Sequence, residues 1–164
     1  MNLILAVIAA TALGGLPTGT NGVVRVTSDN AFYDNKEGYA YLNGHVFVDD
    51  ADCQLHADRA YVFTEGTNGL KRVVALGHVA LTNGTKRAYG EKASYYRKSG
   101  LVVLNAGEGA PAEVRDEAEG GAQVVRGKKI KYWVPTKQVE VQEAWITAPR
   151  GNMSKSGIKD LLGN

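Results

Sequence analysis

Three histidines and one cysteine are the side chains best suited to bind a transition metal in this chain of 164 residues. His45 and His78 occupy equivalent positions in two similar segments, and His56 lies between them. Their separations match no zinc-binding pattern, and the lone Cys53 cannot form a multi-thiolate site or an internal disulfide. We therefore expect surface positions for the histidines, and we predict neither a metal site nor a cofactor.

No other combination of residues indicates a catalytic centre. Gly107-Glu108-Gly109 begins a dinucleotide-binding pattern, but the third glycine and the strand-to-helix setting are absent. The serines have no Gly-x-Ser-x-Gly surroundings, which excludes the usual nucleophile turn of hydrolases. The acidic residues within 49–52 suit a solvated hairpin loop and need no calcium ion to explain them. The sequence therefore predicts a protein that is not an enzyme and has no catalytic residues.

Arg126, Lys128 and Lys129 form the most suggestive charged group. A net charge of +2 with no long basic run argues against a nucleic-acid partner. The basic group has two interpretations. It is either the polar face of a strand or a contact for a phosphate group.

The elements that must position these residues are predicted to be strands. Glycine is abundant, with 20 residues, and proline is scarce, with 4. After Gly22, apolar and polar residues alternate over short stretches that end at Asn, Asp or Gly, a pattern typical of strands joined by tight turns. The length suits one domain, so the sequence predicts a single all-β domain.

Four segments repeat one pattern, which makes about four strand-turn-strand units. They read VTSDNAFY, LHADRAYV, AYGEKASY and VRGKKIKY, beginning at Val26, Leu55, Ala88 and Val125. In each, a small residue and an Ala or Ile are three apart, so a regular strand would place them on opposite faces. A bulge at the intervening polar pair, such as Asp58-Arg59, would bring both to one face and bend the strand. Four such bends would curve the sheet into a trough or barrel.

A second segment, with glycine and histidine at its centre, also recurs. Residues 40–48 align with residues 73–81, and one face of each is aliphatic and small throughout. Strand parity therefore predicts a common apolar interior. The residues that we expect to line it are Leu42, Val46, Val48, Leu55, Ala60, Val62, Val73, Val79, Leu81, Tyr95, Ile130, Tyr132, Val139 and Val141.

The third unit departs from the repeat. Residues 107–121 are acidic and rich in glycine, and they replace the expected second strand segment. We expect a protruding loop here, which would leave a gap in one side of the trough.

The first residues resemble an export signal. Residues 3–10 read LILAVIAA, and Ala10-Thr11-Ala12 supplies the small-x-small pattern that precedes cleavage. This apolar run is too short for a transmembrane helix. We expect a signal peptide over residues 1–12, a linker over 13–22, the β-domain over 23–148 and a polar tail over 149–164.

The ordered series SDNAFY, LNGHV, ADRAYV, LGHV and GKKIKYW resembles the OstA-like (LptA-type) family of periplasmic lipopolysaccharide-transport proteins, over about residues 24–148. The resemblance implies an open, twisted antiparallel β-jellyroll whose apolar trough binds the acyl chains of lipid A. It also implies a passive bridge that carries lipopolysaccharide from the inner to the outer membrane. The residues expected to line the interior would then bind lipid, and Arg126, Lys128 and Lys129 would contact its head group.

The same resemblance implies partners and a location. Protomers would stack head to tail as a homo-oligomer in the periplasm. The chain would also contact inner-membrane-anchored and outer-membrane components of the transport system through their related β-jellyroll domains. Two other interpretations remain open. One is a structural, filament-forming envelope protein without lipid cargo. The other is a sugar-binding or hydrolytic jellyroll, which would need carboxylates and exposed aromatic residues on one concave face.

Overall fold

The computed structural model describes residues 25–34, 36–50, 53–65, 69–117, 122–133, 135–136 and 138–148. The expected signal peptide, linker and polar tail lie outside these residues. Within them, every regular element is a strand. No helix there has the length and hydropathy needed to cross a membrane.

The described residues form one sheet of 12 strands. The strands are β1 (Arg25–Thr27), β2 (Asn30–Asp34), β3 (Tyr39–Asp50), β4 (Cys53–Glu65), β5 (Gly69–Asn83), β6 (Lys86–Tyr96), β7 (Leu101–Asn105), β8 (Ala112–Asp116), β9 (Gln123–Gly127), β10 (Lys129–Trp133), β11 (Gln138–Gln142) and β12 (Trp145–Thr147).

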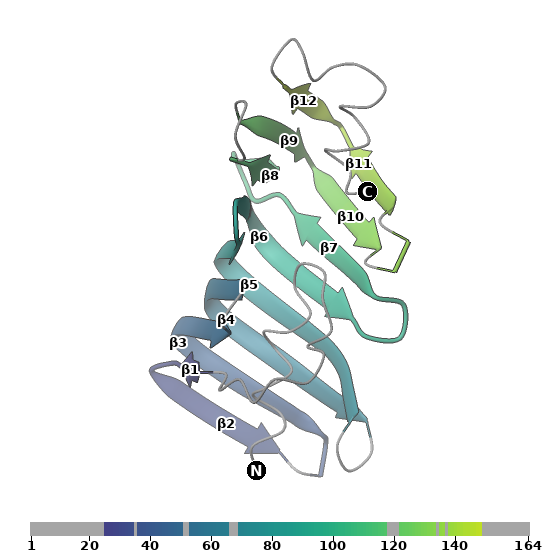
Figure 1. The fold of residues 1–164 in the computed structure, drawn as a ribbon. Helices are drawn as coiled ribbons and strands as arrows, with labels where there is room; N and C mark the ends of the chain where they lie inside the picture. Colours follow the sequence, from purple (N-terminus) through teal and green to yellow (C-terminus); the bar gives the residue numbers. More distant parts are fainter. Residues whose placement is uncertain are drawn as a thin grey trace.

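All of the strand pairs are antiparallel, and the sheet does not close (Figure 1). The main path runs β1-β3-β4-β5-β6-β7-β10-β11, while β2 pairs with β3, β8 with β6 and β9, and β12 with β9. The expected fold class, an open antiparallel all-β jellyroll, is confirmed.

Each long strand belongs to two walls of the molecule, which meet at a bend. Residues 47–49 of β3 pair with β1, whereas residues 39–43 pair with β2. In the same way, residues 86–89 of β6 pair with β8 and residues 92–96 pair with β7. We call the wall that contains β1, β8, β9 and β12 the β1 wall, and the wall that contains β2, β7, β10 and β11 the β2 wall. The chain crosses from the β1 wall to the β2 wall and back four times, once in each repeated unit.

The bend lies at the Gly-His pairs of β3 and β5. The pairing register shifts between Asn43 and Val46, and again between Leu76 and Val79. Glycine and histidine both have positive φ there, with Gly77 at 77° and His78 at 48°. Two consecutive left-handed residues turn the strand sharply, and glycine allows this because it has no Cβ.

The sequence predicts a bulge in the strand that contains Asp58-Arg59, and this was wrong, because the bulge lies in the neighbouring strand β3. Ala57 and Ala60 are both buried, so the small residue and the alanine do share one face. The extra residue, however, belongs to the neighbouring Gly-His strand rather than to the polar pair Asp58-Arg59. A left-handed pair needs glycine first, and the polar pair contains none.

The inward faces of the two walls meet in one apolar core. Leu42, Val62 and Val73 come from the β2 wall, and Val48 and Val79 come from the β1 wall, yet all five belong to one contiguous cluster. The alternation of residues along each strand produces this core, because it places a continuous set of aliphatic side chains on the inner face.

The expectation of a protruding loop over residues 107–121 was wrong, because part of this segment forms a strand. Ala112–Asp116 forms β8, which pairs with β6 on one side and β9 on the other. Ala112 is fully buried, and Val114 packs against the core. The acidic character misled the prediction, because Glu113 faces outward and two arginines neutralise it. The β1 wall is therefore continuous across the third unit.

The bend gives a prediction about glycine. Gly77 and Gly109 have φ values of 77° and 82°, but a Cβ on Gly77 would overlap the Asp58 carboxylate while one on Gly109 would meet nothing within 4 Å. Gly109→Ala should lower the free energy of unfolding by about 1 kcal/mol through backbone strain alone. Gly77→Ala should cost about 1–2 kcal/mol more, because the overlap adds to that strain. Urea denaturation of both variants measures the difference, and equal losses would contradict the close packing at the bend.

Candidate functional site

The interior between the two walls is the candidate site. Most of the residues expected to line it are buried together, with exposed fractions between 0% and 6%. They are Leu42, Val46, Val48, Leu55, Ala60, Val62, Val73, Val79, Leu81 and Ile130. Tyr95, Val139 and Val141 are partly buried and pack against this cluster. Tyr132 pairs with Val102 and Val139 and is half-buried, but it lies outside the cluster.

The interior also contains residues that the sequence prediction did not include. Most of them are alanines or lie in the segment taken for a loop and the strand after it. They are Ala57, Ala88, Ala93, Leu104, Ala112 and Val125. Alternation in residues 112–116 and 123–127 is the signal that could have identified the last two.

The chemistry of the interior is that of aliphatic hydrocarbon. Ser94 is the only buried polar residue in the part of the chain that the structure describes, and it pairs with Val74 and Val103, which are outside the core cluster. An unbranched alkyl chain would be stabilised here by about 0.8 kcal/mol for each buried methylene. Among the described residues, the interior cluster contains no charged side chain that could bind a polar ligand.

The interior side chains pack closely against one another. Val46, Val48 and Val62 have an exposed fraction of 0%. Valine and alanine dominate, so the two walls lie close together. A guest chain would therefore enter only as the walls move apart.

The apolar lining continues to both open edges of the sheet. At the β1–β2 edge, Val26 packs against the core, and Tyr33, which pairs with Ala40, is 43% exposed. At the other edge, Ile146 pairs with the buried Val125 and is 50% exposed. Apolar side chains of the inner face are therefore exposed on the edge strand at each end.

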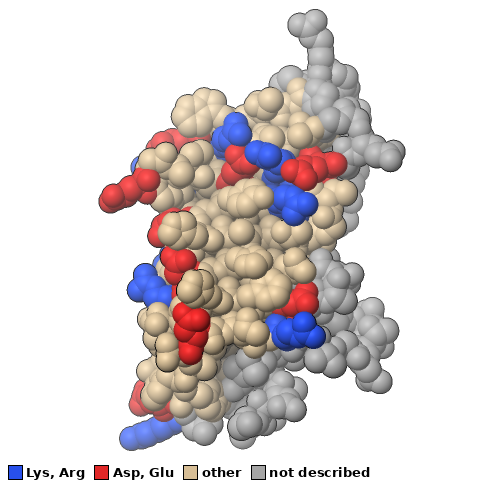
Figure 2. All heavy atoms as spheres, turned by 90° about the vertical axis from the view of Figure 1, so that its left-hand side faces the viewer, with Lys and Arg blue, Asp and Glu red and all other residues tan. Residues whose placement is uncertain are grey.

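Two histidine–aspartate pairs lie on the outside of the bend. His45 Nδ1 is 2.8 Å from Asp29 Oδ2, and His78 Nδ1 is 2.8 Å from Asp58 Oδ2. The side chains of His45 and His78 are 91% and 87% exposed, which confirms the expected surface positions. Hydrogen bonds to the aspartates, followed by their negative charge, raise the pKa of each histidine. Figure 2 shows this bent side of the molecule, with acidic side chains spaced along it.

The basic residues considered as a phosphate contact lie around the β9–β10 junction, outside the apolar core. Arg126 Nε donates a hydrogen bond to Glu113 Oε2 at 2.6 Å, and Lys128 Nζ is 3.3 Å from Glu143 Oε1. Lys129 pairs in the sheet with Asn105 and Gln142. Two of the three basic residues, Arg126 and Lys128, are therefore already paired with carboxylates.

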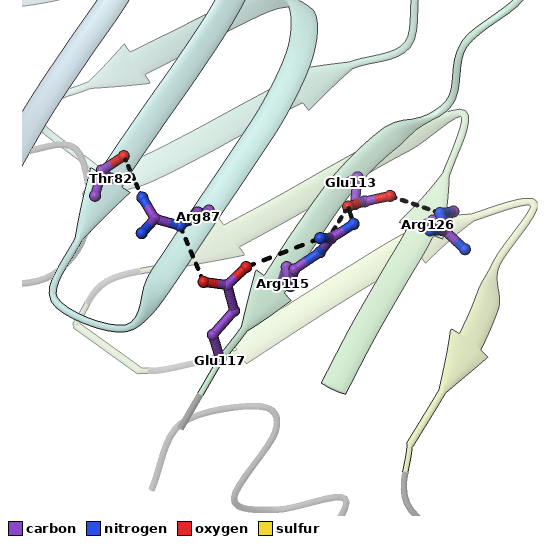
Figure 3. Close-up of polar contacts among 6 residues, drawn as sticks. All are labelled: Thr82, Arg87, Glu113, Arg115, Glu117 and Arg126. Atoms are coloured by element: carbon purple, nitrogen blue, oxygen red, sulfur yellow. Dashed lines mark hydrogen bonds and ion pairs between the residues drawn. The ribbon is translucent and has the colours of Figure 1, made fainter. Parts of the chain in front are cut away.

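Glu113 is the centre of an ionic network on the outer face of the β1 wall (Figure 3). Arg115 and Arg126 both donate hydrogen bonds to its carboxylate, and Glu117 links Arg115 to Arg87. Burial alone would raise the pKa of Glu113, but the two guanidinium groups outweigh burial and hold it below its ordinary value. The network links residues of β6, β8 and β9 and so stabilises the pairing of these strands. The acidic composition of this segment had suggested a loop instead.

Comparisons with known proteins agree with this architecture. A family model described as "LptA/(LptD N-terminal domain) LPS transport protein" matches residues 25–138. A solved structure of LptH from Pseudomonas aeruginosa is similar, with a TM-score of 0.56 and 25% sequence identity, over 81% of this chain and 86% of that one. Its title describes LptH as the LptA-homologous periplasmic component of the conserved lipopolysaccharide transport device. No curated protein matches the sequence significantly.

Proposed function

The chain belongs to the LptA/LptD N-terminal family of lipopolysaccharide transport proteins, and from this premise we propose that it binds lipopolysaccharide between its two walls as a periplasmic bridge. Family membership confirms the resemblance that the sequence suggested. It gives the chain a role in lipopolysaccharide transport, which is not an enzymatic activity. The lipid-binding interior, the stacking of protomers and the periplasmic location are the proposal.

The apolar interior, continuous from one edge of the sheet to the other, is the observation that carries the proposal. An acyl chain of about fourteen carbons loses roughly 10 kcal/mol when water replaces an apolar environment. A lipid that crosses an aqueous compartment therefore needs uninterrupted apolar cover. Val26 and Tyr33 at one edge and Ile146 at the other extend the lining to both ends.

The open edges support head-to-tail association of protomers. Phe32 and Tyr33 of β2, and Trp145 and Ile146 of β12, are among the most exposed large apolar side chains of the described residues. Unpaired backbone groups on edge strands pair readily with another strand, and a contact that does not close on itself produces a filament. The same edges would receive the related domains of the inner-membrane-anchored and outer-membrane components.

Contact between the lipid head group and Arg126, Lys128 and Lys129 remains part of the proposal. A phosphate there would have to replace Glu113 beside Arg126 and Glu143 beside Lys128. Arginine forms strong paired hydrogen bonds with phosphate, which makes such an exchange chemically reasonable.

Photocrosslinking from two adjacent tyrosines tests the lipid site. Tyr95 packs against the core, while its neighbour Tyr96 is 37% exposed on the opposite face. With benzoylphenylalanine in place of Tyr95, irradiation with lipopolysaccharide should give a covalent adduct. The same probe in place of Tyr96 should give little adduct, because it points away from the interior.

The two probes also separate the alternatives. Adducts from neither position in a folded protein would contradict the lipid site and favour a structural filament without cargo. Equal adducts from both positions would indicate adsorption of lipid to the surface.

Association of protomers is tested at β12. Ile146→Lys places a charge on the open edge strand, where it should weaken pairing with a second chain. Analytical ultracentrifugation should then show a shift from oligomers towards monomer. Tyr89→Lys is the matched control, because Tyr89 is also exposed, at 39%, but lies on β6 between two paired neighbours. An unchanged oligomer distribution for Ile146→Lys would exclude this edge from the contact.

A further inference from the structure

The outer side of the bend carries a repeated arrangement that the transport role does not by itself require. In each unit, one residue lies where the chain crosses to the β2 wall, and another lies where it returns. In the first two units these are Asp29 with His45 and Asp58 with His78, and both pairs have an oxygen–nitrogen distance of 2.8 Å.

The fourth unit has the same arrangement with the charges reversed. Lys128 lies at the outward crossing and Glu143 at the return, and their side chains are 3.3 Å apart. The backbone shares this equivalence, because His45, His78 and Glu143 are the three non-glycine residues with positive φ in the described part of the chain. Different residue types thus place an oppositely charged or hydrogen-bonded pair beside a left-handed residue at three places along the bend, although only the first two have a left-handed glycine before it.

The third unit keeps only part of the arrangement. Glu91 lies at the outward crossing, and a Cβ on Gly107 at the return would be 3.1 Å from the Glu91 Cβ. Glycine offers no side chain to bond, so this unit has no such pair.

Each pair includes a residue with positive φ at the bend, so the side-chain contact restrains the backbone where one wall would rotate relative to the other. The Asp29 amide donates a hydrogen bond to the Gly44 carbonyl at 2.9 Å, while the Asp29 side chain contacts His45. The Lys128 amide likewise donates to the Gln142 carbonyl at 2.8 Å. A change in the angle between the walls that altered φ and ψ at these left-handed residues would move the paired side chains apart.

No strand pairing joins the two walls at their rims in the part of the chain that the structure describes. Strands β3 to β6 pair with one another on both sides of the bend, but each paired residue lies in the same wall as its partner, so the walls can separate without breaking a ladder of hydrogen bonds. Two features therefore oppose opening, namely the packed interior and the pairs along the bend. An acyl chain between the walls would replace the first but would not reach the second, because the pairs lie on the outside of the bend.

We propose that the pairs Asp29–His45, Asp58–His78 and Lys128–Glu143 set the angle between the walls and thereby the width of the interior that an acyl chain can occupy. The consequence for lipid rests on the proposed function. The effect on the angle does not, and it can be measured without lipid.

Distances between spin labels on the two walls test the proposal in the full chain. Lys71 and Lys86 are exposed residues at the outer ends of the β2 and β1 walls, so labels there report the angle at β5. Cysteines replace both lysines in a Cys53→Ser background. Lys71 and Lys92, which lie on the same wall, form the control pair of labels.

The variant changes the aspartates rather than the histidines, because alanine at a position with positive φ would add strain of its own. Asp29→Ala with Asp58→Ala should broaden the Lys71–Lys86 distance distribution and shift it to longer values. The Lys71–Lys92 distribution should not change. Asp49→Ala, which removes a carboxylate that accepts a hydrogen bond from Gln54 away from the bend, should alter neither distribution. If the double variant fails to fold, each single variant leaves the other pair intact and gives a smaller shift.

A second measurement connects the angle to lipid. Fluorescently labelled lipopolysaccharide should dissociate faster from the double variant than from the wild-type protein or from Asp49→Ala. An unchanged Lys71–Lys86 distribution would overturn the inference whatever the lipid result. A wild-type protein that binds no lipopolysaccharide would overturn the proposed function, and the distance measurement would still decide the inference.

Discussion

The structure depends on one constraint, which is that a sheet with an apolar face must cover that face. The described residues contain no helix that could do so. The sheet therefore bends along a single line, and its two halves bury each other's inner surface. The left-handed Gly-His pairs of β3 and β5 make this possible within continuous strands. Pairing within each wall, the single core and the open edges all follow from that bend.

The same constraint is compatible with the proposed function, because the core cluster of the described residues is aliphatic. A lipid and the opposite wall are equivalent partners for the inner surface, because both offer hydrocarbon. In the packed interior, each wall therefore buries the apolar face of the other. In the proposed function, a guest chain would replace the contacts of Val46, Val48 and Val62, which have no exposed surface.

Much of the fold follows from parity in the sequence. Alternation identified the inner face of β3, β4 and β5 correctly. A buried unpaired charge would destabilise the fold, so the inner positions of these strands are all uncharged and stand out in the sequence. The bulge was placed on the wrong strand, since sequence periodicity does not show which partner carries the extra residue. β8 was missed because the charges of Glu113 and Arg115 suggested a loop, and their neutralisation by pairing becomes visible only in three dimensions. The pairs of Asp29 with His45 and of Asp58 with His78 join residues 16 and 20 positions apart, a relation that spacing alone does not reveal.

The central claim is that lipid occupies the space between the walls, and methyl NMR tests it most directly. Val46, Val79 and Val125 carry methyl groups in the core cluster, whereas Val74, Val103 and Val124 are valines outside it. Titration with lipopolysaccharide should shift the first set of methyl resonances and leave the second set in place. Shifts confined to the second set, or none in either set at saturating lipid, would contradict the account.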